Sequence, residues 1–123
     1  EILSIDPVFT AGTSLLPNNA SLSAEGELNR RRRVSLQGAY PNPFNPTTTI
    51  SFYLPKEQFV KIDIINIQGH NVIVLQNDNK SEGYHEVKWT GKNQQGETVN
   101  TGVYLCRMRT GTDRRTIKIV YIN

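Results

Sequence analysis

Short runs of alternating apolar and polar residues are the feature that most constrains how this chain folds. Three such runs are clear, at residues 48–54, 60–64 and 85–89. A period of two puts every second side chain on the same face, which is the pattern of a strand with one buried face. In the second run we expect Lys61 and Asp63 to face outward. No segment has an apolar stripe of helical period, so the sequence predicts an all-β fold.

Further apolar runs and turn signals extend this pattern. Residues 72–75, 103–108 and 117–122 are short apolar runs, and the last two are apolar on both faces, as interior strands or covered edges are. Asn- and Gly-rich segments at 66–69, 77–83, 93–96 and 110–113 predict turns between them. About seven short strands separated by frequent turns favour an immunoglobulin-like antiparallel β-sandwich, with a small barrel as the alternative. We expect Trp89 to anchor its core.

The chain divides into two compositional regions. Residues 1–33 have no sustained period and end in four arginines, which predicts an extended N-terminal arm or a solvated linker, and residues 34–123 form the β module. Because the chain begins at Glu1 rather than Met, we expect that a leader has been removed or that the chain was trimmed. Apolar arm residues are candidates for strand exchange with a neighbouring subunit, namely Ile2, Leu3, Ile5, Val8 and Phe9.

Composition excludes several classes of function. A net charge of +3 is too weak to argue for nucleic acid, and no run approaches the roughly 20 apolar residues of a membrane-spanning helix. The only cysteine, Cys106, cannot form an internal disulfide, and with His70 and His85 it makes a zinc site improbable. We expect Cys106 to be a small buried residue, His85 to lie at the core edge and His70 to be exposed. The sequence thus predicts no catalytic residues, no metal and no cofactor.

Three prolines within seven residues predict an irregular segment before the first clear strand. This proline segment (residues 40–46) consists of Tyr40, Pro41, Asn42, Pro43, Phe44, Asn45 and Pro46. Each proline deletes a backbone donor and pushes its predecessor toward extended geometry, so the segment cannot lie in a sheet centre. We expect Asn42 and Asn45 to bond nearby backbone groups, and Tyr40 and Phe44 to cover the end of the sandwich.

Glycines after Trp89 predict a tight connection. Gly91 and Gly96 are expected to set the reversal of the chain, and Gly102 to mark a bulge or a close backbone approach. We expect Tyr104 to pack its ring and to donate a hydrogen bond from its hydroxyl. The run 77–79 faintly resembles a calcium loop, but its spacing is wrong for one and a plain polar turn is the prediction.

Residues 34–55, VSLQGAYPNPFNPTTTISFYLP, closely resemble the start of the C-terminal sorting domain of proteins exported by the type IX secretion system. They also resemble the related immunoglobulin-like domain of flagellar hook-capping proteins. The similarity continues through residues 60–72, 83–108 and 116–122, whereas residues 1–33 match no family. The resemblance implies a non-enzymatic module at the bacterial cell surface, read by the secretion machinery. By the same resemblance, the recognised residues are Gly102, Val103, Tyr104, Lys118, Ile119 and Val120.

Two other functions stay open at this point. The module is a candidate structural subunit that builds a filament or homo-oligomer through its arm, because sheet edges accept added strands. It is also a candidate carbohydrate-binding or spacer domain. The aromatic residues available for a sugar are Tyr53, Phe59 and Tyr84, and the sequence places them in different segments.

Overall fold

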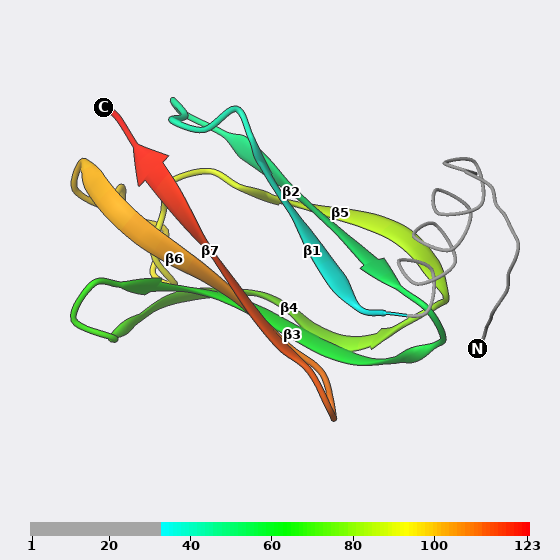
Figure 1. The fold of residues 1–123 in the computed structure, drawn as a ribbon. Helices are drawn as coiled ribbons and strands as arrows, with labels where there is room; N and C mark the ends of the chain where they lie inside the picture. The colour runs from blue at the N-terminus through cyan, green and yellow to red at the C-terminus, as the bar shows by residue number, and fades with distance from the viewer. Residues whose placement is uncertain (1–32) are drawn as a thin grey trace, which may run out of the picture. The chain divides into compact units, whose positions relative to one another are not determined.

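The computed structural model describes residues 33–123, which form seven strands (Figure 1). The strands are β1 (Ser35–Tyr40), β2 (Thr48–Leu54), β3 (Gln58–Asn66), β4 (Asn71–Lys80), β5 (Gly83–Trp89), β6 (Gly102–Arg109) and β7 (Arg114–Tyr121). The all-β prediction is confirmed: within the described residues there is no helix, and so none that could span a membrane.

The strands form two antiparallel sheets that pack as a sandwich. One sheet has the order β1-β2-β5 and the other the order β4-β3-β6-β7. The chain therefore changes sheet after β2, after β4 and after β5, and Figure 1 shows the two layers. Sheet changes of this kind, with hairpins in between, are the architecture of an immunoglobulin-like sandwich. The fold class predicted from the sequence is confirmed.

The alternating residues of the central strands make the core. Every second residue of β2 is inaccessible to solvent, as are Val60, Ile62 and Ile64 of β3 and Cys106 of β6. Each fully buried aliphatic side chain of this kind stabilises the fold by about 1.5–3 kcal/mol relative to leaving it exposed. The inward faces read from the sequence are thus the faces that meet between the sheets.

Strand β4 is longer than its apolar run predicts. The Asn- and Asp-containing residues 77–80 were expected in a turn, but they belong to β4 and pair with β3 as far as the Gln58–Lys80 pair. Backbone pairing with β3 outweighs the low strand propensity of these residues. The reversal is left to Ser81 and Glu82, so the run that resembles a calcium loop is an extended strand.

Four aromatic rings fill one end of the sandwich. The ring centroid of Phe44 lies 5.2 Å from that of Trp89 and 4.9 Å from that of Tyr121, and the Trp89 and Tyr104 centroids are 5.3 Å apart. The indole Nε1 of Trp89 donates to the backbone oxygen of Lys92 at 2.9 Å. Trp89 is therefore the core anchor that the sequence predicted, and the four rings are named the aromatic cluster below.

Gly91 gives the aromatic cluster room to close. Its φ is +72°, and a Cβ added there would lie 3.1 Å from two ring carbons of Tyr121. Gly96 has a φ of +84°, and its backbone nitrogen donates to Asn93 in a turn, but a Cβ there would meet nothing within 4 Å. Only glycine adopts such φ values without strain. Both glycines shape the connection, and Gly91 alone of the two also packs against a ring.

Replacing these two glycines by alanine separates backbone strain from packing. Both Gly91→Ala and Gly96→Ala strain a positive-φ position, which costs about 1 kcal/mol. Gly91→Ala additionally crowds Tyr121, so we expect it to lose about 1–2 kcal/mol more than Gly96→Ala. Urea denaturation of the two variants measures the difference. Equal losses would mean that Tyr121 moves aside freely.

Candidate recognition surface

The six residues predicted as a recognition site lie on two paired strands but point to both sides of the sheet. Val103 pairs with Val120, and Lys118 pairs with Leu105. These positions alternate with Tyr104 and Ile119, which are buried in the core. Val103 and Lys118 are exposed and Val120 is half-buried, so these three side chains form the accessible part, named the β6–β7 surface below.

Gly102 does not have the role that the sequence suggested. It opens β6 opposite Tyr121, the β6–β7 register runs without a bulge, and a Cβ there would meet nothing within 4 Å. Its φ of 157° lies at the border of the extended range. The prediction of a bulge or close approach is therefore wrong at Gly102. The close approach in this part of the fold occurs at Gly91 instead.

Tyr104 holds the start of β6 from inside. Its hydroxyl donates to the backbone oxygen of Asn100, four residues upstream, while its ring contacts Trp89. This is the arrangement of the tyrosine corner in immunoglobulin-like sandwiches. The pKa of the Tyr104 hydroxyl is raised, mainly by burial and to a smaller extent by the charge of the nearby Tyr121. The predicted packing and hydrogen bond of Tyr104 are both confirmed.

The proline segment pairs with the free edge of β7. The side-chain Nδ2 of Asn42 donates to the Lys118 oxygen, and its Oδ1 accepts from the Val120 nitrogen, both at 2.9 Å. Two residues after Asn42, the backbone nitrogen of Phe44 donates to the Val120 oxygen at 2.9 Å, and the Phe44 oxygen accepts from the Ile122 nitrogen at 3.0 Å. A side-chain amide and one residue of backbone therefore take the place of a neighbouring strand. All three X-Pro bonds in the segment are cis.

These contacts correct two expectations for the proline segment. Asn42 bonds a strand more than 70 residues away rather than nearby backbone, whereas the exposed Asn45 makes no side-chain hydrogen bond within residues 33–123. Phe44 covers the end of the sandwich as predicted, being 2% exposed, but Tyr40 is 82% exposed. Tyr40 pairs with Thr49 on the outer side of its sheet, because the strand alternation continues to that residue.

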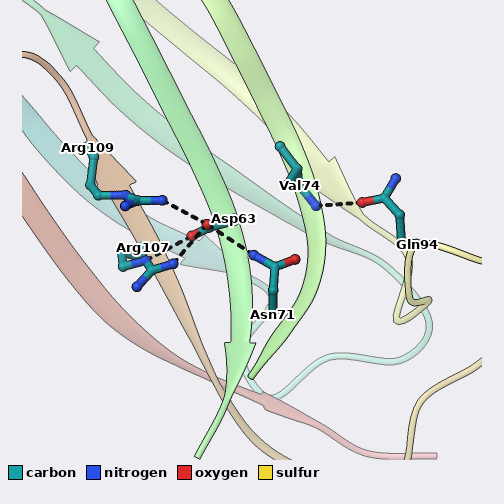
Figure 2. A network of polar contacts seen from close by, with 6 residues as sticks. All are labelled: Asp63, Asn71, Val74, Gln94, Arg107 and Arg109. Atoms are coloured by element: carbon teal, nitrogen blue, oxygen red, sulfur yellow. Dashed lines mark hydrogen bonds and ion pairs between the residues drawn. The ribbon is translucent and has the colours of Figure 1, made fainter. Parts of the chain in front are cut away.

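A second carboxamide occupies the opposite edge of the same sheet. The Oε1 of Gln94 accepts from the Val74 nitrogen of β4 at 3.1 Å, as Figure 2 shows. The backbone nitrogen of Gln94 donates to the Val72 oxygen at 2.9 Å. Unpaired strand edges are templates for aggregation, and covering them removes that liability. Both outer strands of the four-stranded sheet are thus partly covered by loops of the same module.

Asp63 is a buried charge, which the sequence reading missed. It was expected in solvent, but its carboxylate is fully inaccessible and accepts from Arg107 at 3.0 and 3.1 Å and from Arg109 at 3.2 Å (Figure 2). Asn71 adds a further bond at 3.2 Å. The hydrogen bonds that Arg107 donates to Asp63 raise the pKa of the Arg107 guanidinium. Asp63 does lie on the outer face, but the two arginines of β6 cover it, which is possible because Arg107 pairs directly with Asp63.

The histidines and the cysteine lie where the sequence placed them. His85 stacks on Phe52 with centroids 5.3 Å apart, and its Nε2 lies 2.8 Å from the Ser81 oxygen, at the core edge. His70 is exposed, and Cys106 is buried. The pKa of the Cys106 thiol is raised to about 12, mainly by burial and to a smaller extent by the negative charge of Asp63. The thiol therefore stays protonated at neutral pH. A protonated thiol is a poor nucleophile.

The residues of the two alternative functions have different outcomes. Ile2, Leu3, Ile5, Val8 and Phe9 lie outside the described residues, so strand exchange through them stays a prediction. Tyr53 and Tyr84, expected in separate places, are cross-strand neighbours with ring centroids 4.7 Å apart. Phe59 belongs to β3 of the other sheet. The three aromatics therefore do not form one sugar-binding face.

Asn42 and Asn45 offer a matched test of edge closure, because both precede a proline and both are exposed. Asn42→Ala removes two hydrogen bonds to β7, so we expect a loss of about 1–2 kcal/mol in the free energy of unfolding. Asn45→Ala should change it by less than about 0.5 kcal/mol. Denaturant titration of both variants measures this. A loss as large in Asn45→Ala would show that the effect is not edge pairing.

Cys106 provides a test of burial and of pH dependence. The unfolded thiol ionises near its ordinary pKa of 9.0, whereas the folded thiol keeps its proton up to about 12. Folding stability should therefore fall as pH rises through this interval, because the unfolded state loses its proton first. Cys106→Ala should have a shallower decline. At neutral pH, iodoacetamide should alkylate the native thiol about 100-fold more slowly than the thiol in urea. Equal rates would refute burial.

Among solved structures similar to this chain, two with TM-scores of 0.50 or more agree with this architecture. Latent dimeric PorU from Porphyromonas gingivalis aligns with a TM-score of 0.60 and 17% identity over 72% of this chain and 9% of its own. PorZ, an essential surface component of the type IX secretion system of the same organism, aligns with a TM-score of 0.50 and 21% identity. The alignment covers 70% of this chain and 11% of PorZ. FlgD from P. aeruginosa aligns with a TM-score of 0.49 and 23% identity, over 60% of this chain and 58% of FlgD. No curated protein matches the sequence.

The chain spans only about a tenth of PorU and PorZ, so these likenesses show the fold alone. A family model, that of the secretion system C-terminal sorting domain, matches residues 38–123, well over half of the chain. The matched region begins inside β1 and ends at the last residue, so it includes the proline segment, both sheets and the β6–β7 surface. The chain therefore belongs to the family of secretion system C-terminal sorting domains, which mark proteins exported by the type IX system to the cell surface or the extracellular space.

Proposed function

We propose that this module is read by the export machinery through the β6–β7 surface and that it then keeps the exported protein at the cell surface. The observation that carries the proposal is that alternate residues of these two strands face the core and the solvent. Tyr104 and Ile119 are committed to the core, which leaves Val103, Lys118 and Val120 to face a partner. Membership of a sorting family supports a partner in the secretion machinery.

The chemistry of this surface suits a protein partner. Val103 and Val120 are neighbours across two strands, and Val103 is 40% exposed, so together they offer a small apolar patch. Lys118 lies two residues along β7 and adds an exposed positive charge. An apolar centre beside a polar rim is the composition of a protein interface. Asn42 and Phe44 already bond the outer edge of β7, so we expect little ordering of this strand on binding and a correspondingly low entropic cost.

Deleting residues 116–123 is a poor test, because the deletion removes most of β7 and takes Tyr121 from the aromatic cluster. Loss of export would then report unfolding as well as lost recognition. Point changes on the β6–β7 surface avoid this difficulty. Lys88, on the outer face of β5, is also exposed and supplies a control with the same change of charge.

The full chain fused behind a secreted reporter, in a bacterium with a type IX system, tests the proposal. We expect Lys118→Glu or Val103→Asp to lower the exported fraction about ten-fold, because each alters a group facing the partner. Lys88→Glu should leave export unchanged, and denaturant titration should show all three variants folded. Unchanged export in both surface variants would rule out this recognition surface. Full export with the reporter free in the medium would contradict surface retention.

A further inference from the structure

Three cations lie side by side in one row across the four-stranded sheet. Lys61 of β3 pairs with Arg109 of β6, which pairs with Arg114 of β7. Directly paired residues of antiparallel strands present their side chains on the same face, and like charges placed opposite each other destabilise the sheet. Of the three, only Arg109 contacts a carboxylate within residues 33–123, that of Asp63, so the repulsion within the row is offset only in part.

The carboxylates near this row are already in use. Asp63 is shared between Arg107 and Arg109, so that cluster keeps one excess positive charge. Asp113, in the turn before β7, pairs with Arg115 at 3.4 Å. Within residues 33–123, Lys61 and Arg114 form no ion pair. The excess near the row is thus greater than one charge, which favours a multiply charged anion over a single carboxylate.

An open pocket of about 460 Å³ lies over the row. Its walls are Phe59, Lys61, Arg109, Arg114 and the turn of residues 110–113. Phe59 is 51% exposed and supplies one apolar wall. The Nε of Arg109 is buried and has no hydrogen-bond partner among the described residues. Small-ligand sites have volumes of about 300–1,000 Å³ and combine apolar walls with a few polar groups, and this opening has both features.

From these features we propose that the pocket binds a phosphate ester, with the phosphate among Lys61, Arg109 and Arg114 and the organic body against Phe59. Arginine forks and lysine ammonium groups are the side chains that bind phosphate oxygens in proteins. The pocket lies between the start of β3 and the β6–β7 turn, and none of Val103, Lys118 and Val120 lines it. The site is therefore separate from the β6–β7 surface, and its test is independent of export.

Titration of the full chain with inorganic phosphate, glucose 1-phosphate and glucose tests the proposal, with ¹⁵N NMR as the readout. We expect glucose 1-phosphate to bind most tightly and to shift the amide signals of residues 110–114 and the Nε–H signal of Arg109. Glucose alone should not bind. Sedimentation with phosphatidylcholine vesicles, with and without phosphatidic acid, shows whether a lipid headgroup is also a source of the phosphate.

Matched variants decide the outcome. Lys61→Gln and Arg114→Gln should each weaken glucose 1-phosphate binding about three- to ten-fold, while Lys88→Gln on the other sheet should leave it unchanged. Phe59→Ser should remove the advantage of glucose 1-phosphate over inorganic phosphate. Saturable binding to neither glucose 1-phosphate nor phosphatidic acid vesicles would overturn the proposal. So would an equal loss in Lys88→Gln, which would indicate only general attraction to a basic protein.

Discussion

Four hydrogen bonds between the proline segment and the edge of β7 hold one end of the sandwich closed. Asn42 supplies two of them through its carboxamide, and Phe44 supplies the other two through its backbone. They place the Phe44 ring between Trp89 and Tyr121, which belong to different sheets. The segment that leaves β1 thereby joins the two layers. These bonds fix the backbone of Phe44 on β7, and its ring thereby packs against Trp89 and Tyr121 in the aromatic cluster.

The prolines limit which groups of residues 40–46 can pair with β7. A residue without a backbone donor cannot extend a regular ladder, so the segment pairs through Phe44 and the Asn42 side chain only. A complete strand at this position would leave a new free edge of its own. The amide of Asn42 instead bonds the Lys118 oxygen and the Val120 nitrogen without a strand of its own. At β4, the side-chain oxygen and the backbone nitrogen of Gln94 cover the edge in a similar way.

Most of the fold could be predicted from the sequence, because alternation directly reports which face of a strand is buried. The inward residues of β2 and β3 and the core position of Trp89 followed from that pattern. Errors arose where long-range pairing decides the outcome. Residues 77–80 have the composition of a turn but extend β4, because β3 provides partners for them.

The candidate sites show the same limit. Asp63 alternates like a solvent-facing residue, and only the register with β6 places Arg107 and Arg109 over it. The pairing of Asn42 with β7 is equally invisible locally, since more than 70 residues separate the partners. Resemblance to a family supplied the sorting function, but not which of the six predicted residues are accessible. That distinction depends on the alternation within β6 and β7 once their register is known.

The link between Phe44 and Tyr121 has a consequence for the order of events during synthesis. Tyr121 and the last edge bonds of β7 involve residues made nearly 80 positions after the proline segment. A growing chain therefore cannot complete its aromatic cluster until β7 has left the ribosome. Any chain released early would lack both the final strand and the β6–β7 surface. The aromatic cluster at this end of the sandwich therefore closes only after the residues of β7 have been translated.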